Sequence, residues 1–407
     1  MGLEPNHTGN SRLVDLHVHL APQLSVYPSD RMPTVDPFRC RSCSEPVHAL
    51  VLDLGEQPAS DVFPAAADDP ADEERWPLRA CVCESCWLVQ LAPVDGIVPQ
   101  APLATESATS QRLAHSGVES LIQRTGLGPS STVIELTSHH GGSWLPTLEE
   151  RGLVIAERDQ AQLVVDVHAL AHEEDIDGSL ASYAQRLTSD GWVALEFHHL
   201  LPLIVDAQFD TVRHGHPVYL SVLALQPALS RNGLDAVDAV VSPAFGGSVL
   251  LLARPSATRS RPTSALTRLI AQERAAGLDS VDALQLVQAK ADESASALRS
   301  YLELAAAEGR TVLGYGAPSK APIRLCYADI GPDLLAMTAD LSPAKHGRRL
   351  PGCGIPITSP QELLAAGPDE VMILTWDISR EVVDQLTAAG AAEVAFSVPA
   401  PLPRRVK

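Results

Sequence analysis

Cys40-Arg41-Ser42-Cys43 and Cys83-Glu84-Ser85-Cys86 are two Cys-x-x-Cys pairs near the start of the chain, and they frame the stretch that decides its fold. Between them lies Val51-Leu52-Asp53-Leu54-Gly55-Glu56-Gln57-Pro58, and Trp87-Leu88-Val89-Gln90-Leu91 follows the second pair. Four thiolates in two close pairs can surround one Zn²⁺ tetrahedrally. The spacing therefore predicts a small zinc-nucleated module with a structural Zn²⁺ held by Cys40, Cys43, Cys83 and Cys86.

The size and charge of the chain limit what it can be. Its 407 residues suffice for two or three domains, and 45% of them are apolar. With 50 acidic and 30 basic residues, the formal charge is −20, which repels nucleic acid and anionic membranes. We find no apolar run of about 18 residues and no secretory signal. Seven cysteines, four of them in metal spacing, fit a reducing compartment, so we expect a cytoplasmic protein. The oligomeric state does not follow from the sequence.

Hydrophobic patterns divide the chain into four predicted parts. They are an N-terminal extension (1–38), a zinc-binding module (39–95), a middle α/β domain (96–256) and a C-terminal α/β domain (257–407). Short β-rich runs bounded by turns predict the strands, and longer patterns predict helices. The strands are expected at 132–136, 163–168, 192–196, 235–241, 249–253, 311–313, 334–338 and 371–375, and helices at 106–126 and within 264–308.

Several motifs together resemble the sugar C-methyltransferases of antibiotic pathways. They are Asp53-Leu54-Gly55, Gln57-Pro58, Asp61-Val62-Phe63-Pro64, the second cysteine pair with Val89-Gln90-Leu91, and Gly314-Tyr315-Gly316-Ala317. Phe209-Asp210-Thr211-Val212-Arg213-His214-Gly215-His216 is similar to the catalytic stretch of that family. The resemblance implies a zinc-binding module, a class I methyltransferase-like Rossmann domain and a second, C-terminal Rossmann-like domain. It also implies an enzyme that uses S-adenosylmethionine (SAM) to methylate a carbon of a nucleotide-linked 4-keto-deoxysugar.

The segment that would hold SAM departs from the family pattern. Where the family has Glu-Ile-Gly-x-Asn-Asp-Gly after the first strand of the middle domain, this chain has Glu135-Leu136-Thr137-Ser138-His139-His140-Gly141. The first glycine is replaced by Thr137, although Gly141 and Gly142 still permit a tight turn. If a cofactor binds here, the resemblance assigns it to Glu135, Gly141 and Gly142, with Glu157 on the ribose.

Two further departures concern the length of the middle domain and its catalytic stretch. Residues 153–159 run almost directly into the strand at 163, so about one βα unit of some 30 residues is missing. We therefore predict a shortened methyltransferase-like domain without an adenine wall. In the catalytic stretch, Arg213 stands for the family's tyrosine and Gly215 for its glutamate, whereas His216 corresponds to its histidine base.

Eight of the 14 histidines lie at predicted strand ends or in adjoining loops of the middle domain. They are His139, His140, His168, His172, His198, His199, His214 and His216. Ligands bind at the carboxyl ends of parallel strands, so we expect these imidazoles to lie together in one crevice at that edge of the predicted sheet. They could transfer protons, with His216, His214, His140, His198, His172 and Arg213 as the catalytic candidates. With nearby acidic residues they could instead hold a second, catalytic metal. A hydrated polar cleft in an inactive protein is the third possibility.

The C-terminal domain is predicted to hold the nucleotide of a nucleotide-linked sugar. Gly314-Tyr315-Gly316-Ala317 lies between a strand and a helix, where backbone N–H groups can meet a phosphate. Acidic and basic residues nearby suit a ribose and a diphosphate. The predicted substrate-binding residues are Gly314, Tyr315, Gly316, Lys320, Asp340, Lys345 and Arg348.

Three functions compete at this point. The favoured hypothesis is a SAM-independent epimerase or isomerase, in which His216 removes a proton beside a carbonyl of a nucleotide-linked sugar and Arg213 or other histidines stabilise the enolate. The second is a SAM-dependent sugar C-methyltransferase with an altered SAM turn. The third is a non-catalytic relative that binds a nucleotide-linked sugar or a partner methyltransferase.

Overall fold

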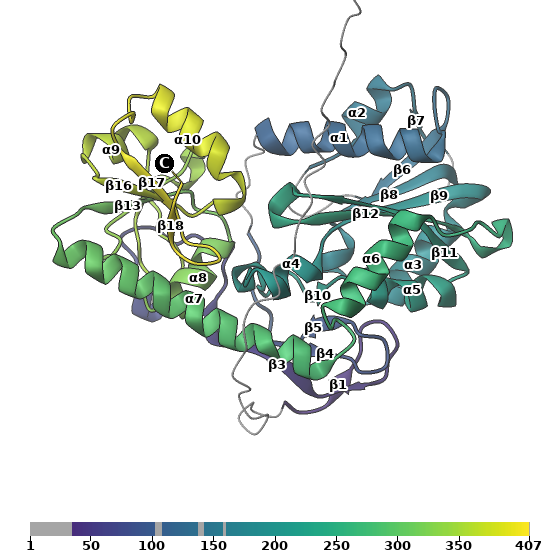
Figure 1. Ribbon diagram of the computed structural model, residues 1–407, viewed down its shortest axis with the longest axis horizontal. Helices are drawn as coiled ribbons and strands as arrows, with labels where there is room; N and C mark the ends of the chain where they lie inside the picture. The colour runs from purple at the N-terminus through teal and green to yellow at the C-terminus, as the bar shows by residue number, and fades with distance from the viewer. Residues whose placement is uncertain (1–34, 102–107, 137–141, 158–159, 407) are drawn as a thin grey trace, which may run out of the picture. The chain divides into compact units, whose positions relative to one another are not determined.

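Three sheets organise the chain in the computed structural model, which describes residues 35–101, 108–136, 142–157 and 160–406. All of these residues belong to one compact unit, Thr34–Lys407, and the other unit, Met1–Pro33, lies outside the described residues. Helices and strands alternate in the middle and C-terminal sheets (Figure 1). The predicted α/β fold class, with a small zinc-binding module ahead of two Rossmann-like sheets, is confirmed.

The N-terminal sheet carries the cysteine turns. Its four strands have the order β10-β5-β4-β3 and run antiparallel. They are β3 (Ala49–Pro58), β4 (Arg75–Val82), β5 (Val89–Leu91) and β10 (Val218–Tyr219), with a separate pair β1 (Phe38–Arg39) and β2 (Pro46–Val47) beside the first cysteine turn. β10 comes from the middle of the chain and directly follows the predicted catalytic stretch. This sheet therefore helps to hold that stretch, which the sequence patterns did not predict.

The middle sheet has six strands in the order β11-β12-β9-β8-β6-β7. The strands are β6 (Thr132–Leu136), β7 (Val154–Ile155), β8 (Ala161–Val167), β9 (Leu187–His198), β11 (Leu234–Ser242) and β12 (Ser248–Pro255). β7, β6, β8 and β9 are parallel, and the hairpin β11–β12 closes the sheet antiparallel to β9. The strand positions predicted for this region are confirmed within a few residues.

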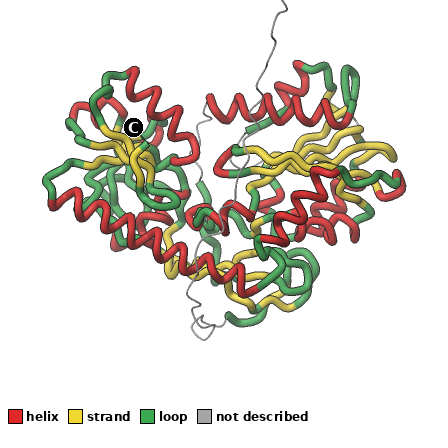
Figure 2. Tube along the Cα trace, viewed as in Figure 1, coloured by secondary structure: helices red, strands yellow, loops and turns green. Residues whose placement is uncertain are grey.

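Helices cover both faces of the middle sheet, as expected for parallel strands rich in valine and leucine. α1 (Ala108–Thr125) and α2 (Leu145–Glu150) lie over one face, and α3 (Ile176–Gln185), α5 (Val222–Arg231) and α6 (Ser264–Ala275) lie over the other (Figures 1 and 2). The apolar core under α1 and α2 joins Leu121 and Trp144 to Leu163 and Val165 of β8.

The β7 edge of the middle sheet is short. β7 pairs with β6 through two residues, and its Val154 and Ile155 are 50% and 48% exposed. In the described part of the chain, no strand lies beyond β7. The prediction that one βα unit is missing from this domain is therefore confirmed.

The C-terminal sheet has six strands in the order β15-β14-β13-β16-β17-β18, parallel except for β18. They are β13 (Val312–Tyr315), β14 (Thr338–Ala339), β15 (Ile357–Thr358), β16 (Glu370–Ile373), β17 (Ala395–Val398) and β18 (Arg404–Arg405). Successive residues alternate between two cores: Val312 packs with α8 (Lys320–Tyr327), whereas Leu313 packs with α9 (Pro360–Ala365) and α10 (Ser379–Ala388). The sheet is thus covered on both faces.

One long helix links the N-terminal and C-terminal sheets. α7 (Val281–Ala307) begins at the N-cap Ser280, whose side chain accepts a hydrogen bond from the backbone N–H of Ala283. Its first half packs Leu284 and Val287 against the N-terminal sheet, and its second half packs Leu298 and Leu302 against the C-terminal sheet. The helix therefore fixes two sheets that each supply residues to the site described below.

The strand predicted at 334–338 is wrong, because only Thr338–Ala339 forms β14. The residues before it turn instead: the N–H of Leu335 donates to the carbonyl of Gly331, and the Leu335 side chain fills the core beside α8. Among helices of the described residues, none is both long and apolar enough to cross a membrane. The three boundaries between the four predicted parts stay a prediction.

Candidate functional site

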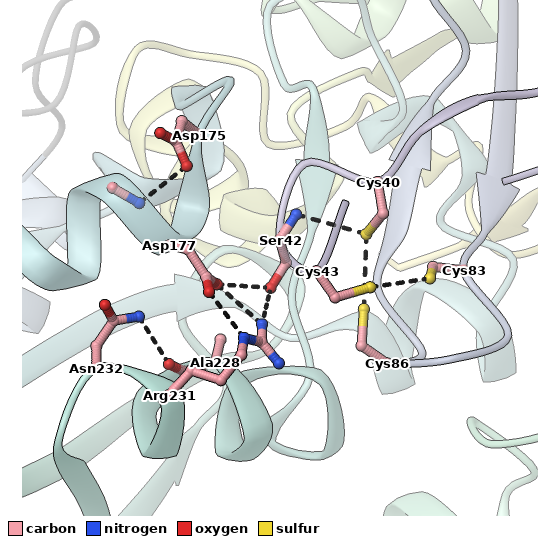
Figure 3. Close-up of polar contacts among 11 residues, drawn as sticks. Cys40, Ser42, Cys43, Cys83, Cys86, Asp175, Asp177, Ala228, Arg231 and Asn232 are labelled. Carbon is pink, nitrogen blue, oxygen red and sulfur yellow. Dashed lines mark hydrogen bonds and ion pairs between the residues drawn. The ribbon is translucent and has the colours of Figure 1, made fainter. Parts of the chain in front are cut away.

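Each Cys-x-x-Cys pair forms a tight turn of the same design. Cys40 and Cys83 each accept a backbone hydrogen bond from the residue four positions on, Ser44 and Trp87. Those two residues adopt positive φ values of 60° and 63°, which reverses the chain after the second cysteine. Two equivalent turns therefore present their four thiols to each other (Figure 3).

The four sulfurs have the geometry of a zinc site. Cys40 Sγ lies 3.6 Å from Cys86 Sγ and Cys43 Sγ lies 3.5 Å from Cys83 Sγ, and all four lie within 4.8 Å of one another. A tetrahedron with Zn–S bonds of about 2.3 Å has edges of about 3.8 Å. The contacts with Cys83 and Cys86 hold the pKa of the Cys40 thiol well below its usual range. The predicted ligand set is confirmed as one converging group, which fits Zn²⁺.

Neighbouring helices hold the first cysteine turn in place. Arg231 on α5 donates to Asp177 Oδ2 on α3 at 2.7 Å and to Ser42 Oγ at 2.7 Å, and Ser42 Oγ donates to Asp177 Oδ1 at 3.0 Å (Figure 3). Gln90 Nε2 on β5 donates to Cys40 Sγ at 3.3 Å. The zinc-binding turn is thus tied to both the middle and the N-terminal sheets, as ligands supported by outer hydrogen bonds usually are.

A second centre is a cavity of about 290 Å³ between the middle and C-terminal sheets. His198 reaches it from the end of β9, and Thr375 and Asp377 from the loop after β16. Arg213 and His216 line it from the segment before β10, and Lys320 from the start of α8. The carboxyl ends of parallel strands in both sheets therefore meet at this cavity, the place where α/β folds bind ligands.

Four of the eight singled-out histidines form a row, which we call the imidazole row. The ring centroids of His168 and His198 are 4.6 Å apart, those of His198 and His216 are 6.1 Å apart, and those of His216 and His172 are 4.6 Å apart. Phe245 packs against the first two rings. The loops after β8 and β9 and the segment before β10 bring these rings together, as the topology predicted.

The other histidines lie elsewhere or are not described. His199 is buried, and its Nε2 lies 2.8 Å from Glu273 Oε1, whose carboxylate also caps the N-terminus of α5. His214 Nε2 donates to the carbonyl of Pro77 at 3.2 Å, and burial lowers the pKa of its imidazole. Both contacts join structural elements; His199 also lines the cavity, whereas His214 does not. His139 and the catalytic candidate His140 lie outside the described residues.

Arg213 connects the imidazole row to the N-terminal sheet. Its Nη1 donates to Asp61 Oδ2 at 2.7 Å, and its Nη2 donates to His216 Nε2 at 2.7 Å. A guanidinium can only donate, so His216 Nε2 must accept and the neutral ring carries its proton on Nδ1. The nitrogen of His216 that faces Arg213 is thus engaged in this hydrogen bond, and the role predicted for His216 as a base stays a prediction.

Burial sets the charge state of the groups around His198. Burial, with His168, Lys320 and Arg213, lowers the pKa of His198 well below its usual value, so the ring is neutral near pH 7. Burial also raises the pKa of Glu196 to about 8. Glu196 Oε2 lies 3.5 Å from His168 Nε2, behind the row. The imidazole row therefore contains a neutral ring that can accept a proton, and a buried carboxyl that retains its proton at neutral pH lies beside the row.

The residues predicted to hold SAM have mostly local roles. Glu135, near the end of β6, accepts hydrogen bonds from Ser143 Oγ and from the N–H of Trp144, both at 2.5 Å, and so caps the start of α2. Gly142 adopts a φ of 92°, which the turn requires. Glu157 is exposed after β7, and Gly141 lies outside the described residues. The role of these residues in binding a cofactor stays a prediction.

In the C-terminal sheet, Asp340 occupies the turn predicted to bind phosphate. Asp340 Oδ2 accepts from the N–H of Ala317 at 2.8 Å, and Lys345 Nζ donates to the carbonyl of Ala317 at 2.9 Å. Arg348 Nη1 donates to the carbonyl of Phe63 at 2.7 Å. Arg348 therefore joins the C-terminal and N-terminal sheets, and Lys345 holds the turn after β13. The role of both residues in binding a diphosphate stays a prediction.

The remaining predicted substrate residues surround the same turn. Gly314 and Tyr315 end β13, and burial raises the pKa of the Tyr315 hydroxyl to about 12. Gly316 has a φ of 96°, and a Cβ there would lie 2.8 Å from a methyl of Thr375. Lys320 lines the cavity, where its Nζ lies 2.5 Å from Asp377 Oδ1 and 4.0 Å from the centroid of the Trp376 ring. Of the predicted substrate-binding residues, Lys320 is therefore the one that lines the cavity.

Two buried carboxylates near the cavity were missed as site residues, although both lie in quoted motifs. Asp210 Oδ2 accepts from Arg324 Nε at 2.8 Å and from Trp376 Nε1 at 3.0 Å, which joins the middle and C-terminal sheets. Asp61 receives Arg213, as described above. The sequence signal that could have indicated a buried acid was an aspartate next to an apolar residue, as in Phe209-Asp210.

The second, catalytic metal that the sequence allowed has no preformed set of ligands among the described residues. The four cysteines are the one group there whose metal-ligand atoms converge.

Comparisons with known proteins agree with the motifs. A model of the C-methyltransferase C-terminal domain matches residues 243–401, and a model of a zinc-binding domain matches residues 40–94. The C-methyltransferase NovU of Streptomyces niveus is 26% identical over 90% of this chain and 96% of its own.

Two solved methyltransferase structures are similar to part of the chain. Magnesium protoporphyrin IX methyltransferase of Synechocystis PCC 6803, solved with bound SAH, is 13% identical, with a TM-score of 0.27, over 36% of this chain and 83% of its own. The 1,6-didemethyltoxoflavin-N1-methyltransferase of Burkholderia thailandensis is 16% identical, with a TM-score of 0.25, over 41% of this chain and 95% of its own.

Proposed function

Because the chain belongs to the C-methyltransferase family, we propose that it enolises a nucleotide-linked keto-deoxysugar, and that it returns the proton rather than adding a methyl group. The reaction is then an isomerisation or epimerisation on the methyltransferase scaffold. Enolisation is also the first step that carbon methylation beside a carbonyl requires, so the proposal keeps the family's substrate chemistry and changes the fate of the enolate.

The residues that line the cavity can carry this reaction. His198 accepts the proton from the carbon beside the carbonyl, because its imidazole is neutral at pH 7. The electron pair of that C–H bond forms the new C=C bond, and the carbonyl oxygen becomes an oxyanion. Arg213 stabilises the oxyanion, and His216 orients the guanidinium through the 2.7 Å contact. The protonated His198 then returns the proton to the other face or to the adjacent carbon.

The observation that carries the proposal is the pairing of a neutral imidazole and a guanidinium on one small cavity. Its volume of about 290 Å³ suits a single sugar ring, because drug-sized ligands usually occupy about 300–1,000 Å³. A nucleotide attached to that sugar would extend beyond the cavity. Lys320 and Asp377, which also line the cavity, supply a donor and an acceptor for sugar hydroxyl groups.

The cofactor side of the middle sheet supports return of the proton. SAM would supply an electrophilic methyl group, and adenosine needs a wall beyond the second strand of the fold. Within the described ranges the sheet stops at β7, and the Glu135 carboxylate is already used by Ser143 and Trp144. These two observations support a reaction in which no step involves SAM.

SAM-dependent C-methylation is the second candidate, and the similarity to NovU over nearly the whole chain favours it. One experiment separates the candidates. The purified protein is incubated in D₂O with a dTDP-linked 4-keto-deoxysugar, first without and then with SAM, and the sugar protons are followed by NMR. Deuterium uptake without SAM is the expected result. A new methyl signal that requires SAM would establish the second candidate, and absence of both would indicate a non-catalytic protein.

His198→Gln is the variant that tests the proposed base. General base catalysis contributes about 10²- to 10⁴-fold to a rate, so we expect exchange to fall by that range. His214→Gln is the matched control, because His214 contacts Pro77 away from the cavity. Equal loss in the two variants would overturn the assignment of His198 as the base.

A further inference from the structure

Asp61 is a buried carboxylate that joins the N-terminal sheet to the C-terminal sheet. It follows β3 of the N-terminal sheet and is 1% exposed. Its Oδ2 accepts from Arg213, in the segment that leads into β10, at 2.7 Å. Its Oδ1 accepts from the hydroxyl of Ser319, in the turn between β13 and α8. A buried charge in this position needs such partners, and here each partner comes from a different part of the chain.

The guanidinium of Arg213 transmits the position of Asp61 to the imidazole row. A guanidinium is planar and rigid, so fixing one of its nitrogens fixes the direction of the others. Nη1 is fixed by Asp61, and Nη2 points to His216 Nε2 at 2.7 Å. The backbone of Arg213 is also restrained, because its N–H donates to the hydroxyl of Tyr219 at 3.0 Å. The carboxylate of Asp61 therefore sets which nitrogen of His216 carries the proton.

We propose that Asp61 is a positioning residue of the site, which holds Arg213 toward the cavity and keeps His216 in the Nδ1–H form. Its effect on turnover rests on the proposed function, but its effect on the His216 tautomer does not. This assigns part of the catalytic geometry to the zinc-binding end of the chain. It also explains the presence of an arginine at position 213, because a buried Asp61 supplies the matching charge.

Asp61 also balances charge around the proposed base. Burial is the main cause that lowers the pKa of His198, and the neighbouring groups that lower it further are His168 after β8, Lys320, Arg213 and His172. Lys320 is paired with Asp377, and Asp61 is the corresponding partner of Arg213. Without the Asp61 charge, Arg213 would disfavour protonation of His198 more strongly. The pKa of His198 would then fall further, and the acidic limb of the pH–rate profile would move to lower pH.

Asp61→Asn keeps the shape of the side chain and removes its charge, so it is the test variant. Selective ¹⁵N labelling of histidine reports the His216 tautomer in the wild-type protein and the variant. We expect a single Nδ1–H form in the wild type and a mixture in the variant. Deuterium exchange should fall about 10-fold or more with little change in KM, because a small misplacement of a catalytic group has effects of this size.

Two further variants keep the test decisive. Asp61→Glu retains the charge and should recover part of the lost rate, and Asp53→Asn, in the same sheet but paired with Arg79, is the matched control. An unchanged tautomer and an unchanged acidic limb in Asp61→Asn would overturn the proposal. If the wild-type protein shows no exchange, the proposed function fails, and the ¹⁵N spectra still decide the role of Asp61.

Discussion

The four-cysteine centre and the cavity are built in opposite ways. The cysteines come from two short turns of one sheet, and each turn fixes two ligands through its own backbone hydrogen bonds. The cavity instead collects His198, Arg213 and Lys320 from segments that reach it only after three sheets have assembled. The comparison shows that the metal centre is locally encoded, whereas the candidate chemistry depends on long-range packing. Changes at the two centres should therefore have different consequences.

Loss of the metal is expected to have the largest effect. Structural Zn²⁺ binds small zinc domains with about 10–16 kcal/mol, much of which is folding free energy. In Cys83→Ser we expect no bound zinc and an unfolded N-terminal sheet, and because β10 pairs with β5, the segment that carries Arg213 should lose its support too. Metal analysis and thermal unfolding by circular dichroism measure this. Cys326→Ser, outside the four-cysteine centre, is the control and should keep one zinc.

A folded, zinc-free Cys83→Ser protein with an intact cavity would contradict the distinction between a locally encoded metal centre and a cavity that depends on long-range packing. It would show that long-range packing alone holds both centres. The opposite result, in which the C-terminal sheet also melts, would show that α7 transmits the loss, since this helix packs on both sheets.

The buried pair Asp210–Arg324 tests the long-range side of the comparison. The two side chains are 2% and 1% exposed, and the pair joins the middle and C-terminal sheets. Removing one partner of a buried pair costs about 3–5 kcal/mol, because the other charge stays buried. Asp210→Asn should lower the free energy of unfolding by this amount in urea titrations while one zinc remains bound.

The matched control for that variant is Arg274→Ala, because the Arg274–Asp279 pair is largely exposed at 3.7 Å. Exposed pairs contribute little, so its unfolding free energy should stay within about 1 kcal/mol of the wild type. If Asp210→Asn also released zinc, the metal centre would depend on distant packing, and the distinction between the two centres would be lost.

The contrast also explains how far the sequence could predict the molecule. Cysteine spacing is a local signal, so the ligand set followed directly from Cys40 to Cys86. Strand patterns placed β6, β8, β9 and the β11–β12 hairpin, and parallel topology then brought His168 and His198 together. Pairing partners are not local signals: nothing in the sequence indicates that Lys345 faces Asp340 and Ala317, or that Arg348 contacts Phe63.

His216 shows the same limit at the level of one atom. The motif around Phe209 to His216 predicted a histidine base, but the function of a ring depends on which nitrogen is engaged. Arg213 occupies Nε2, and Arg213 is itself directed by Asp61, which lies far from it in the sequence. A resemblance can therefore identify the histidine without revealing its role.

The buried Glu196 should make the stability of the folded protein depend on pH. Its pKa is about 8 in the folded protein against 4.5 in the reference state, so the folded state retains a proton that the unfolded state has lost between these values. Stability should therefore fall as pH rises from about 4.5 to about 8, by about 1.4 kcal/mol per pH unit from this group.

Glu196→Gln tests that dependence, because the amide cannot ionise. The difference in unfolding free energy between variant and wild type should grow in favour of the variant as pH rises through this range, as measured by urea titration at several pH values. Glu84→Gln, at an exposed position in the second cysteine turn, is the control and should leave the slope unchanged. Parallel curves for wild type and Glu196→Gln would mean that the buried carboxyl is ionised in the folded protein.

The smallest expected effect comes from Ser42, where the metal centre contacts its surroundings. Ser42 Oγ joins Arg231 and Asp177, and Ser42→Ala removes these hydrogen bonds without touching a ligand. A hydrogen bond contributes about 0.5–1.5 kcal/mol to stability, so the unfolding free energy should fall by this amount. Zinc affinity, measured by competition with a chromophoric chelator, should stay unchanged if the two turns alone determine the geometry of the sulfurs. A marked loss of affinity would instead show that α3 and α5 help to shape the centre, which would make it, like the cavity, a product of assembly.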